Sequence, residues 1–188
     1  METLLPAFLL VLIAQAPDRS AILSATLGAR FGARPVLVAA IAMALALGFA
    51  LAAAAGVLVA PMLSPRAGTL LVALALIAAG LGAIRRSRLT DTLQRWRIGP
   101  FATGFAGLFI LALGDASQFL VFAIAARDAS PLLAMAGATV AAVTIHIAAI
   151  ALGPVQWARL TPAALRWGSA ALFLVIGSAS ALSALRLV

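Results

Sequence analysis

The chain has 188 residues, of which 65% are hydrophobic and only 10% charged, and its mean hydropathy is +1.18. A soluble domain of this size averages about a quarter charged residues and leaves roughly a third of its surface in water, so this composition excludes an ordinary soluble fold. The net charge of +8 comes from arginines between apolar segments, without an aromatic platform beside them, which favours a membrane protein over a nucleic-acid-binding one. The absence of cysteine excludes disulfides and thiolate metal sites.

Six apolar segments, separated by proline, glycine and arginine, approach the roughly 20 residues that one membrane crossing requires. In chain order, the expected spans cover residues 4–28, 35–59, 68–84, 99–126, 131–152 and 165–186. Ala14-Gln15-Ala16 resembles a signal-peptide cleavage site, but no basic residue precedes it and Pro17 follows it, so we expect no cleavage. The pattern predicts an all-α polytopic membrane protein with six transmembrane helices.

The arginines are unevenly distributed over the expected loops. The first, third and fifth loops contain Arg30, Arg34, Arg85, Arg86, Arg88, Arg95, Arg97, Arg159 and Arg166, whereas the opposite side contains Arg66, Arg127 and Arg186. The positive-inside rule then predicts that the odd loops are cytoplasmic and both termini outside, in a membrane such as the bacterial inner membrane. The cluster in the third loop is expected to contact anionic lipid headgroups through Arg85, Arg86, Arg88, Arg95 and Arg97.

An internal repeat relates the two halves of the chain at a constant offset of 97 residues. The offset pairs Asp18 with Asp115, Ser20 with Ser117, Gly56 with Gly153 and Gly80 with Gly177. Because each copy would contain an odd number of spans, the second copy must enter the membrane from the opposite side. We therefore expect two inverted three-helix repeats, residues 1–90 and 91–188, an architecture in which transporters bind their substrate near the midplane.

Asp18 and Asp115 are expected near the middle of the first and fourth spans. The apolar segments on either side of Asp115 contain fourteen and eleven residues, and neither can cross a membrane alone. A charge at that depth costs about 2.5–3.5 kcal/mol on insertion scales, so it normally faces a partner or a water-filled cavity and marks a functional site. The alternative is a structural role, as an ion pair between Asp18 and Arg19 or as a helix-packing hydrogen bond.

Two segments around these aspartates resemble one family signature. Gln15-Ala16-Pro17-Asp18-Arg19-Ser20 and Ala112-Leu113-Gly114-Asp115-Ala116-Ser117-Gln118 are similar to the repeated Glu-x-Gly-Asp-(Lys/Arg)-(Ser/Thr) motif of the Gdt-type divalent-cation transporters. These calcium/manganese–proton antiporters include the transmembrane-protein-165-like proteins, and the resemblance covers nearly the whole chain. It implies that Asp18 and Asp115 line a cation site, with Ser20, Ser117, Gln118 and the basic Arg19 at the other motif positions. Both motif glutamates are replaced, by Gln15 and Ala112.

The remaining side chains are oxygen ligands, which suit a hard cation such as Mn²⁺, Ca²⁺ or Mg²⁺. Amide oxygens of Gln15 and Gln118 would add to the carboxylates and hydroxyls. Pro17 has no amide hydrogen, so the carbonyl of Ile13 is freed as a candidate backbone ligand. Exchange of two protons for one dication would keep the buried charge roughly constant. We therefore expect a cation/proton antiporter, with Mn²⁺ or Ca²⁺ exported from the cytoplasm and no resident cofactor.

His146 lies inside the fifth span, where it is a candidate proton relay or, more commonly for such a residue, a hydrogen-bonded packing histidine. The sequence has no nucleophile–base pair, phosphate-binding glycine loop or zinc-binding spacing, so an enzyme is not expected. Two alternatives to cation transport stay open. One is a non-transporting scaffold or regulatory protein that has lost the motif glutamates, and the other is an exporter of a small organic solute. The oligomeric state is open as well.

Overall fold

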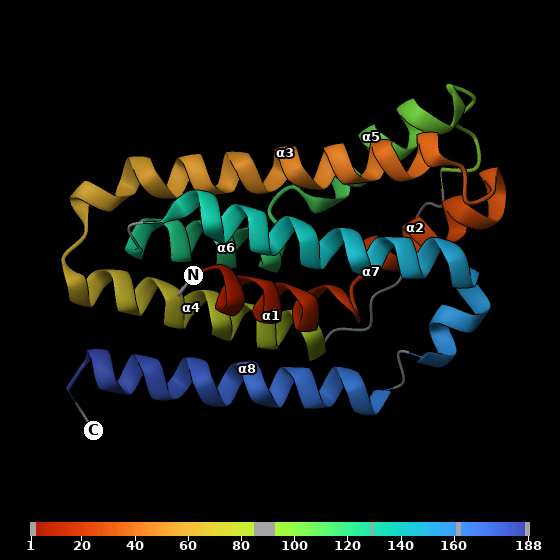
Figure 1. The fold of residues 1–188 in the computed structure, drawn as a ribbon. Coiled ribbons are helices and arrows are strands. Elements are labelled where there is room, and N and C mark those ends of the chain that lie inside the picture. Colours follow the sequence, from red (N-terminus) through yellow and green to blue (C-terminus); the bar gives the residue numbers. More distant parts are fainter. Residues whose placement is uncertain (1–2, 85–92, 129, 161–162, 187–188) are drawn as a thin grey trace.

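The computed structural model describes residues 3–84, 93–128, 130–160 and 163–186. These residues form helices and connecting turns, as expected (Figure 1). The helices are α1 (Leu4–Gln15), α2 (Arg19–Phe31), α3 (Pro35–Val59), α4 (Pro65–Ile84), α5 (Gly99–Ala112), α6 (Ala116–Arg127), α7 (Pro131–Leu160) and α8 (Ala163–Ala184), with the short 3₁₀ helix η1 (Ala60–Met62) after α3. The all-α fold class predicted from the sequence is confirmed.

Four helices, α3, α4, α7 and α8, are each long and apolar enough to cross a membrane. The other four form two bent pairs, α1 with α2 and α5 with α6, whose axes turn by 69° and 66° at the break. If each bent pair is one broken span, the described residues contain six candidate spans, which agrees with a polytopic membrane protein. The boundaries differ from the expected ones mainly in α7, which continues to Leu160 instead of ending near residue 152.

The outer surface carries large apolar side chains that water would not accommodate. Leu58, Met62, Leu132 and Val175 are between 67% and 84% exposed. Exposed apolar area costs about 25 cal/mol per Å² in water and nothing comparable in hydrocarbon. This surface is therefore the lipid-facing side of the bundle.

The two halves of the chain run in opposite directions. In Figure 1, α3 and α7 lie side by side with reversed chain direction, and so do α4 and α8. The halves also exchange packing partners. Helices α1 and α2 of the first half pack on α7, and α5 and α6 of the second half pack on α3. Each broken span is thus held by the long helix of the other half.

The α4–α8 contact depends on two glycines that the offset of 97 residues pairs. A Cβ atom on Gly80 would lie 3.1 Å from the carbonyl oxygen of Ala170, and one on Gly177 would lie 3.0 Å from the carbonyl oxygen of Ala73. Ala73 and Ala170 are themselves 97 residues apart. The contact is therefore reciprocal, and it is the close backbone approach by which membrane helices commonly associate.

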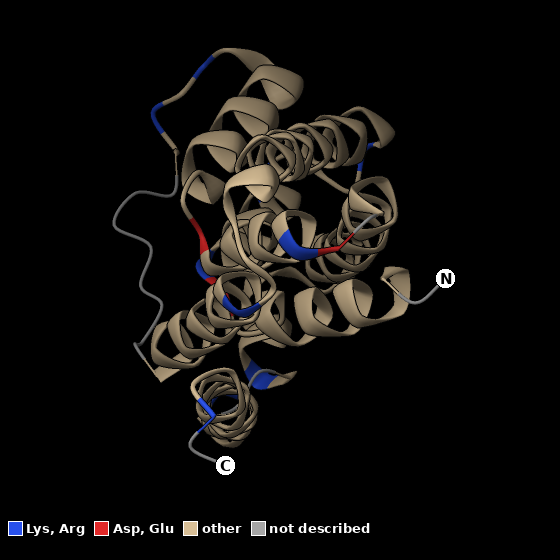
Figure 2. Cartoon of the chain, turned by 90° about the vertical axis from the view of Figure 1, so that its left-hand side faces the viewer, with Lys and Arg blue, Asp and Glu red and all other residues tan. Residues whose placement is uncertain are grey.

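The correspondence between the halves fails at two places. Helix α7 kinks at Gly153, with φ 72°, whereas Gly56, its counterpart, lies within the regular helix α3. Beyond the kink, Trp157 packs with Ala21 and Ala25 of α2. In addition, α4 packs on α6, while the chief contact of α8 is with α4, so that α8 lies at the edge of the bundle (Figure 2).

Arg30, at the end of α2, anchors the segment that leads into the second half. Its guanidinium donates to the carbonyl oxygens of Leu93 and Trp96, both at 2.6 Å, and lies 4.5 Å from the ring of Phe31. The side chain of Leu93 packs against Gly107 of α5. In the sequence Arg30 contributes only to the charge bias that predicts membrane orientation. In the structure it also connects the two halves of the chain.

Apart from Arg19 at the break before α2, the arginines of the described residues lie at or near helix ends, and more of them belong to the odd loops. Those loops and the adjoining helix ends carry Arg30, Arg34, Arg95, Arg97, Arg159 and Arg166, and the opposite ends carry Arg66, Arg127 and Arg186. Both chain termini lie toward these opposite ends (Figure 1). Of the expected headgroup ligands, Arg95 and Arg97 are exposed, and Arg85, Arg86 and Arg88 lie outside the described residues.

Gly177→Ala tests the close α4–α8 contact. The added methyl group would meet backbone atoms of α4, and such overpacking costs about 1–3 kcal/mol, so the thermal unfolding midpoint of the purified protein in detergent should fall. Gly168→Ala in the same helix is the matched control, because no atom lies within 4 Å of its added Cβ. The control should unfold at the parent midpoint or slightly above it. Equal midpoints for the two variants would contradict this helix pairing.

Candidate functional site

Both bent spans break at the aspartate of a motif. Asp18 is the N-cap of α2 and Asp115 is the N-cap of α6, with nearly equal backbone angles of −79°, 155° and −70°, 155°. Each carboxylate accepts from the amide of the serine two residues later, at 2.8 Å for Ser20 and 3.4 Å for Ser117. A carboxylate in this position satisfies an amide that has no partner within its own helix. The two motifs therefore have the same local structure.

Pro17 and Gly114 occupy equivalent positions and interrupt the two spans by different means. Pro17 has no amide hydrogen to donate to the carbonyl of Ile13, so α1 cannot continue through it. Gly114 has φ 76°, a left-handed conformation that other residues rarely adopt. The side chain of Gln118 supports this second break, because its Oε1 accepts from the Gly114 amide at 3.2 Å. The missing Pro17 amide is evident from the sequence, and the structure contains a break there and an equivalent one at Gly114.

Gln15 connects the two motifs. Its side chain is 1% exposed, its Nε2 donates to Ser117 Oγ at 2.9 Å, and its Oε1 accepts from the Ser20 hydroxyl at 3.0 Å. The Ser117 hydroxyl donates to Asp115 Oδ2 at 2.7 Å, and Ser20 Oγ contacts Asp18 Oδ2. A continuous chain of polar contacts thus runs from one aspartate to the other.

The hydroxyl of Ser20 lies between two acceptors, Gln15 Oε1 and Asp18 Oδ2, although a hydroxyl has only one hydrogen to donate. Both contacts are hydrogen bonds if the carboxyl of Asp18 supplies a second hydrogen. If the oxygen and nitrogen of the Gln15 amide were exchanged, the Ser117 hydroxyl would instead face two acceptors, Gln15 Oε1 and Asp115 Oδ2. A second hydrogen would then be needed at that serine. A hydrogen on an aspartate carboxyl would satisfy both contacts of the serine hydroxyl, so the network accommodates protonated carboxylates.

The network continues from Gln15 to His146, which is fully buried. Its Nε2 lies 3.2 Å from Gln15 Oε1 and its Nδ1 lies 2.6 Å from Ser24 Oγ. Because Oε1 can only accept, Nε2 carries the hydrogen and Nδ1 accepts from the Ser24 hydroxyl. A neutral imidazole thereby satisfies both ring nitrogens. Ser24 was not expected from the motifs, although its spacing of four residues from Ser20 places both hydroxyls on one face of α2.

Three other predicted site residues border this network without joining its central chain. Arg19 is exposed at the first position of α2, and within the described part of the chain it forms no ion pair, so the alternative pairing with Asp18 is not observed. Gln118 packs against Gly48 of α3. Ile13 lies in the last turn of α1, partly buried.

The donors that the structure gathers here are oxygens. No group of three or more His, Cys, Asp or Glu side chains that could hold a metal ion occurs among the described residues. The two carboxylates are instead accompanied by serine hydroxyls and the Gln15 amide. Carboxylate and hydroxyl oxygens are the ligands that hard cations prefer.

Comparison with known proteins gives one result. A protein-family model described as "Divalent cation/proton antiporter GDT1" matches residues 3–91 and residues 100–187. The two matched segments begin 97 residues apart, the offset of the internal repeat. No curated protein and no solved structure matches the chain.

Substitutions of Asp115 should separate its capping role from its charge. Asp115→Ala removes the acceptor for the Ser117 amide, and loss of such a cap typically costs about 0.5–2 kcal/mol, so the thermal unfolding midpoint should fall. Asp115→Asn retains a capping oxygen and should unfold close to the parent. If the alanine variant is as stable as the asparagine variant, the carboxylate does not support the start of α6.

Proposed function

Because the chain belongs to the GDT1 family of divalent cation/proton antiporters, we propose that it exports a hard divalent cation, Mn²⁺ or Ca²⁺, from the cytoplasm in exchange for protons. The observation that carries this proposal is the meeting of the two motif aspartates through Ser20, Gln15 and Ser117. Intramembrane carboxylates that meet at a break between helices are a common feature of ion pathways.

The proposed ligands are the carboxylates of Asp18 and Asp115, with the hydroxyls of Ser20 and Ser117. A dication would balance the charges of the two carboxylates, which limits the cost of burying either charge alone. In the structure these oxygens bond to one another, so cation entry would replace hydrogen bonds with coordination. Gln118 and the carbonyl of Ile13 border the site, and the Gln15 amide links its two serines.

We further propose that residues 1–90 and 91–188 are inverted repeats that rearrange around this site. The reversed directions of α3 and α7 and of α4 and α8 support this assignment (Figure 1), as does the reciprocal contact of Gly80 and Gly177. The greater number of arginines at the odd-loop end favours a cytoplasmic position for that end, with both termini outside, in a membrane such as the bacterial inner membrane. Arg95 and Arg97 would then face anionic headgroups.

The principal alternative is a scaffold that retains the fold after replacement of the motif glutamates by Gln15 and Ala112. The buried connection between the aspartates favours transport, since a scaffold needs a capping oxygen at each break but no negative charge there, and an uncharged cap such as asparagine would cost less in a bilayer. An exporter of a small organic solute predicts flux of that solute without dependence on Mn²⁺ or Ca²⁺. Binding of Mn²⁺ should also raise the unfolding temperature of a carrier by mass action.

Transport in proteoliposomes tests the proposal. Under an imposed proton gradient the parent should carry Mn²⁺ or Ca²⁺, and Asp115→Asn should abolish this flux because only one carboxylate remains to balance a dication. Asp115→Glu preserves the charge and should retain part of the flux. Asp128→Asn is the matched control, because Asp128 follows α6 at the far end of that helix from the site, and it should behave like the parent. Absence of flux in the parent, or equal flux in parent and Asp115→Asn, would favour the scaffold.

Cation affinity should depend on pH. Carboxylates bind a metal ion in their ionised form, so protons compete with the cation and binding releases them. Mn²⁺ affinity, measured by calorimetry in detergent, should therefore weaken as the pH falls toward about 5, and the binding heat should vary with the ionisation enthalpy of the buffer. An affinity that is unchanged from neutral pH to that value would contradict proton exchange at this site.

A further inference from the structure

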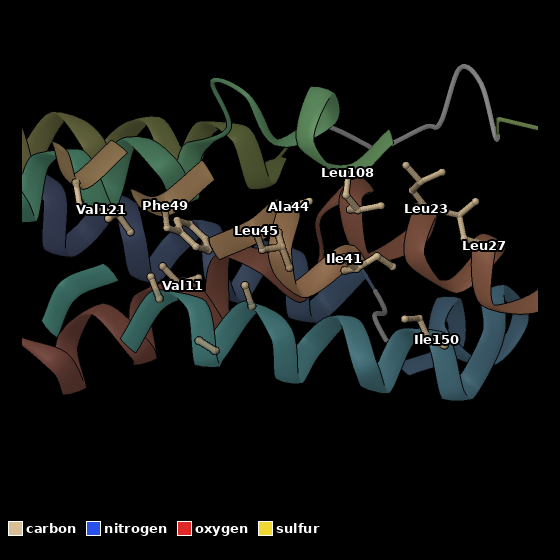
Figure 3. Packing of buried hydrophobic residues seen from close by; sticks show 14 of the residues in the cluster. Val11, Leu23, Leu27, Ile41, Ala44, Leu45, Phe49, Leu108, Val121 and Ile150 are labelled. Atoms are coloured by element: carbon tan, nitrogen blue, oxygen red, sulfur yellow. The ribbon is translucent and has the colours of Figure 1, made fainter. Parts of the chain in front are cut away.

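The polar unit formed by Gln15, His146 and Ser24 lies on one side of the site only. The offset of 97 residues pairs these three residues with Ala112, Phe49 and Val121. All three counterparts are buried and apolar, and Phe49 and Val121 belong to one core cluster (Figure 3).

The counterparts occupy matching places in the packing. Ser24 reaches His146 where α2 packs on α7, and Val121 lies with Phe49 in the cluster where α6 packs on α3. In this second half the same helix arrangement is therefore filled by apolar side chains alone. Packing of the broken span against the long helix does not require a polar contact at these positions.

Burial of the polar unit is costly unless all its members are present. A buried polar group left without a partner costs about 1–3 kcal/mol, and membrane interiors offer little water to replace a missing partner. Each member depends on the next, because Ser24 bonds His146, and His146 bonds Gln15. Three polar residues that occur together and contact one another, where their counterparts are all apolar, point to a role other than packing.

The contacts at the far end of the unit indicate that role. Gln15 Nε2 donates to Ser117, so the hydroxyl hydrogen of Ser117 points to Asp115. Gln15 Oε1 accepts from Ser20 and from His146, so both of its acceptor positions are filled. In this state the amide acts on the site through the two serines and has no free oxygen lone pair for a cation.

We infer that Gln15, His146 and Ser24 form one positioning unit that orients the hydroxyls of Ser20 and Ser117 and makes the two halves of the cation site unequal. The inference rests on the proposed function and deepens it. Ser20, whose hydrogen is taken by Gln15, presents oxygen lone pairs toward Asp18, whereas Ser117 presents its hydrogen to Asp115. With the Gln15 amide oriented as in the structure, the hydroxyl ligand that is ready for a cation is that of Ser20. The reversed amide would exchange the two serines and leave the halves equally different.

The sharpest test uses Ser24, which touches neither aspartate nor either motif serine in the described contacts. Initial rates of Mn²⁺ flux in proteoliposomes should be measured over a range of Mn²⁺ concentrations, so that KM and the maximal rate are obtained separately. Ser24→Ala should raise KM about tenfold, the lower end of the effect typical for residues that orient metal ligands. Ser169→Ala is the matched control, because this buried serine donates to the carbonyl of Arg166 within its own helix α8, and its KM should equal that of the parent.

A triple variant, Gln15→Ala, Ser24→Val and His146→Phe, copies the side chains of the other half. It should fold, because those side chains already pack in the same arrangement there, and its KM should rise by about tenfold or more. Ser24→Ala combined with His146→Phe should raise KM no further than His146→Phe alone, since both act through one chain of contacts.

The outcomes distinguish this inference from the proposed function. Unchanged KM values in Ser24→Ala and in the triple variant, in a parent whose flux is lost in Asp115→Asn, would overturn the positioning role and leave the transport proposal intact. A parent without flux would overturn both. A KM raised equally in Ser24→Ala and Ser169→Ala would assign the effect to general loosening of the fold and would also overturn the positioning role.

Discussion

A helix that stops inside a membrane exposes backbone amides and carbonyls to a solvent that cannot bond them, and this constraint determines the centre of the structure. Both broken spans satisfy it with a carboxylate, since Asp18 and Asp115 cap the amides of Ser20 and Ser117. The positive ends of the α2 and α6 dipoles then face the carboxylates and stabilise their negative charge. The residues that make the breaks tolerable are therefore those that can bind a cation, and a substitution that removes the capping oxygen alters fold and site together.

The long helices of each half support the broken span of the other. Because α3 holds α5 and α6 while α7 holds α1 and α2, a movement of one half relative to the other would change the environment of both breaks together. The network through Gln15 is the polar link across this boundary, and Arg30 forms a second link at the end of α2 through the carbonyls of Leu93 and Trp96. Rearrangement of the halves around the site has to accommodate or break these two links.

The sequence predicts those features that depend on composition and on local chain chemistry. Hydropathy is sufficient for the four long membrane helices and the two apolar segments that form bent pairs. The constant offset pairs the two motifs, and Pro17 marks the interruption beside Asp18. Each of these depends on residues that are close in the chain or on a pattern that covers it all. The expected depth of Asp115 follows from the same kind of argument, since neither flank is long enough to span alone.

Other features depend on contacts between distant residues and could not be derived this way. Ser24 and His146 are 122 residues apart, and nothing in either segment identifies the other as a partner. The kink at Gly153 has a local signal instead, because Pro154 follows it and the expected fifth span ends at residue 152. The offset alone gives no sign of it, since Gly56, the counterpart, lies in a regular helix. The offset of 97 residues is still useful once the structure is known. Where it pairs a polar residue with an apolar one, as at Ser24 and Val121, the two halves differ in role.

The replacement of both motif glutamates limits the charge that the site can exchange. With Gln15 and Ala112 at those positions, the central network contains two carboxylates, and the exposed Arg19 forms no ion pair with either. A dication neutralises two carboxylates, whereas a monovalent cation would leave one buried negative charge without compensation, which a low-dielectric interior strongly disfavours. Return of the empty site is likewise least costly when two protons neutralise the pair. Under the proposed exchange each cycle then moves equal charge in both directions, so the pH gradient, and not the membrane potential, supplies its driving force.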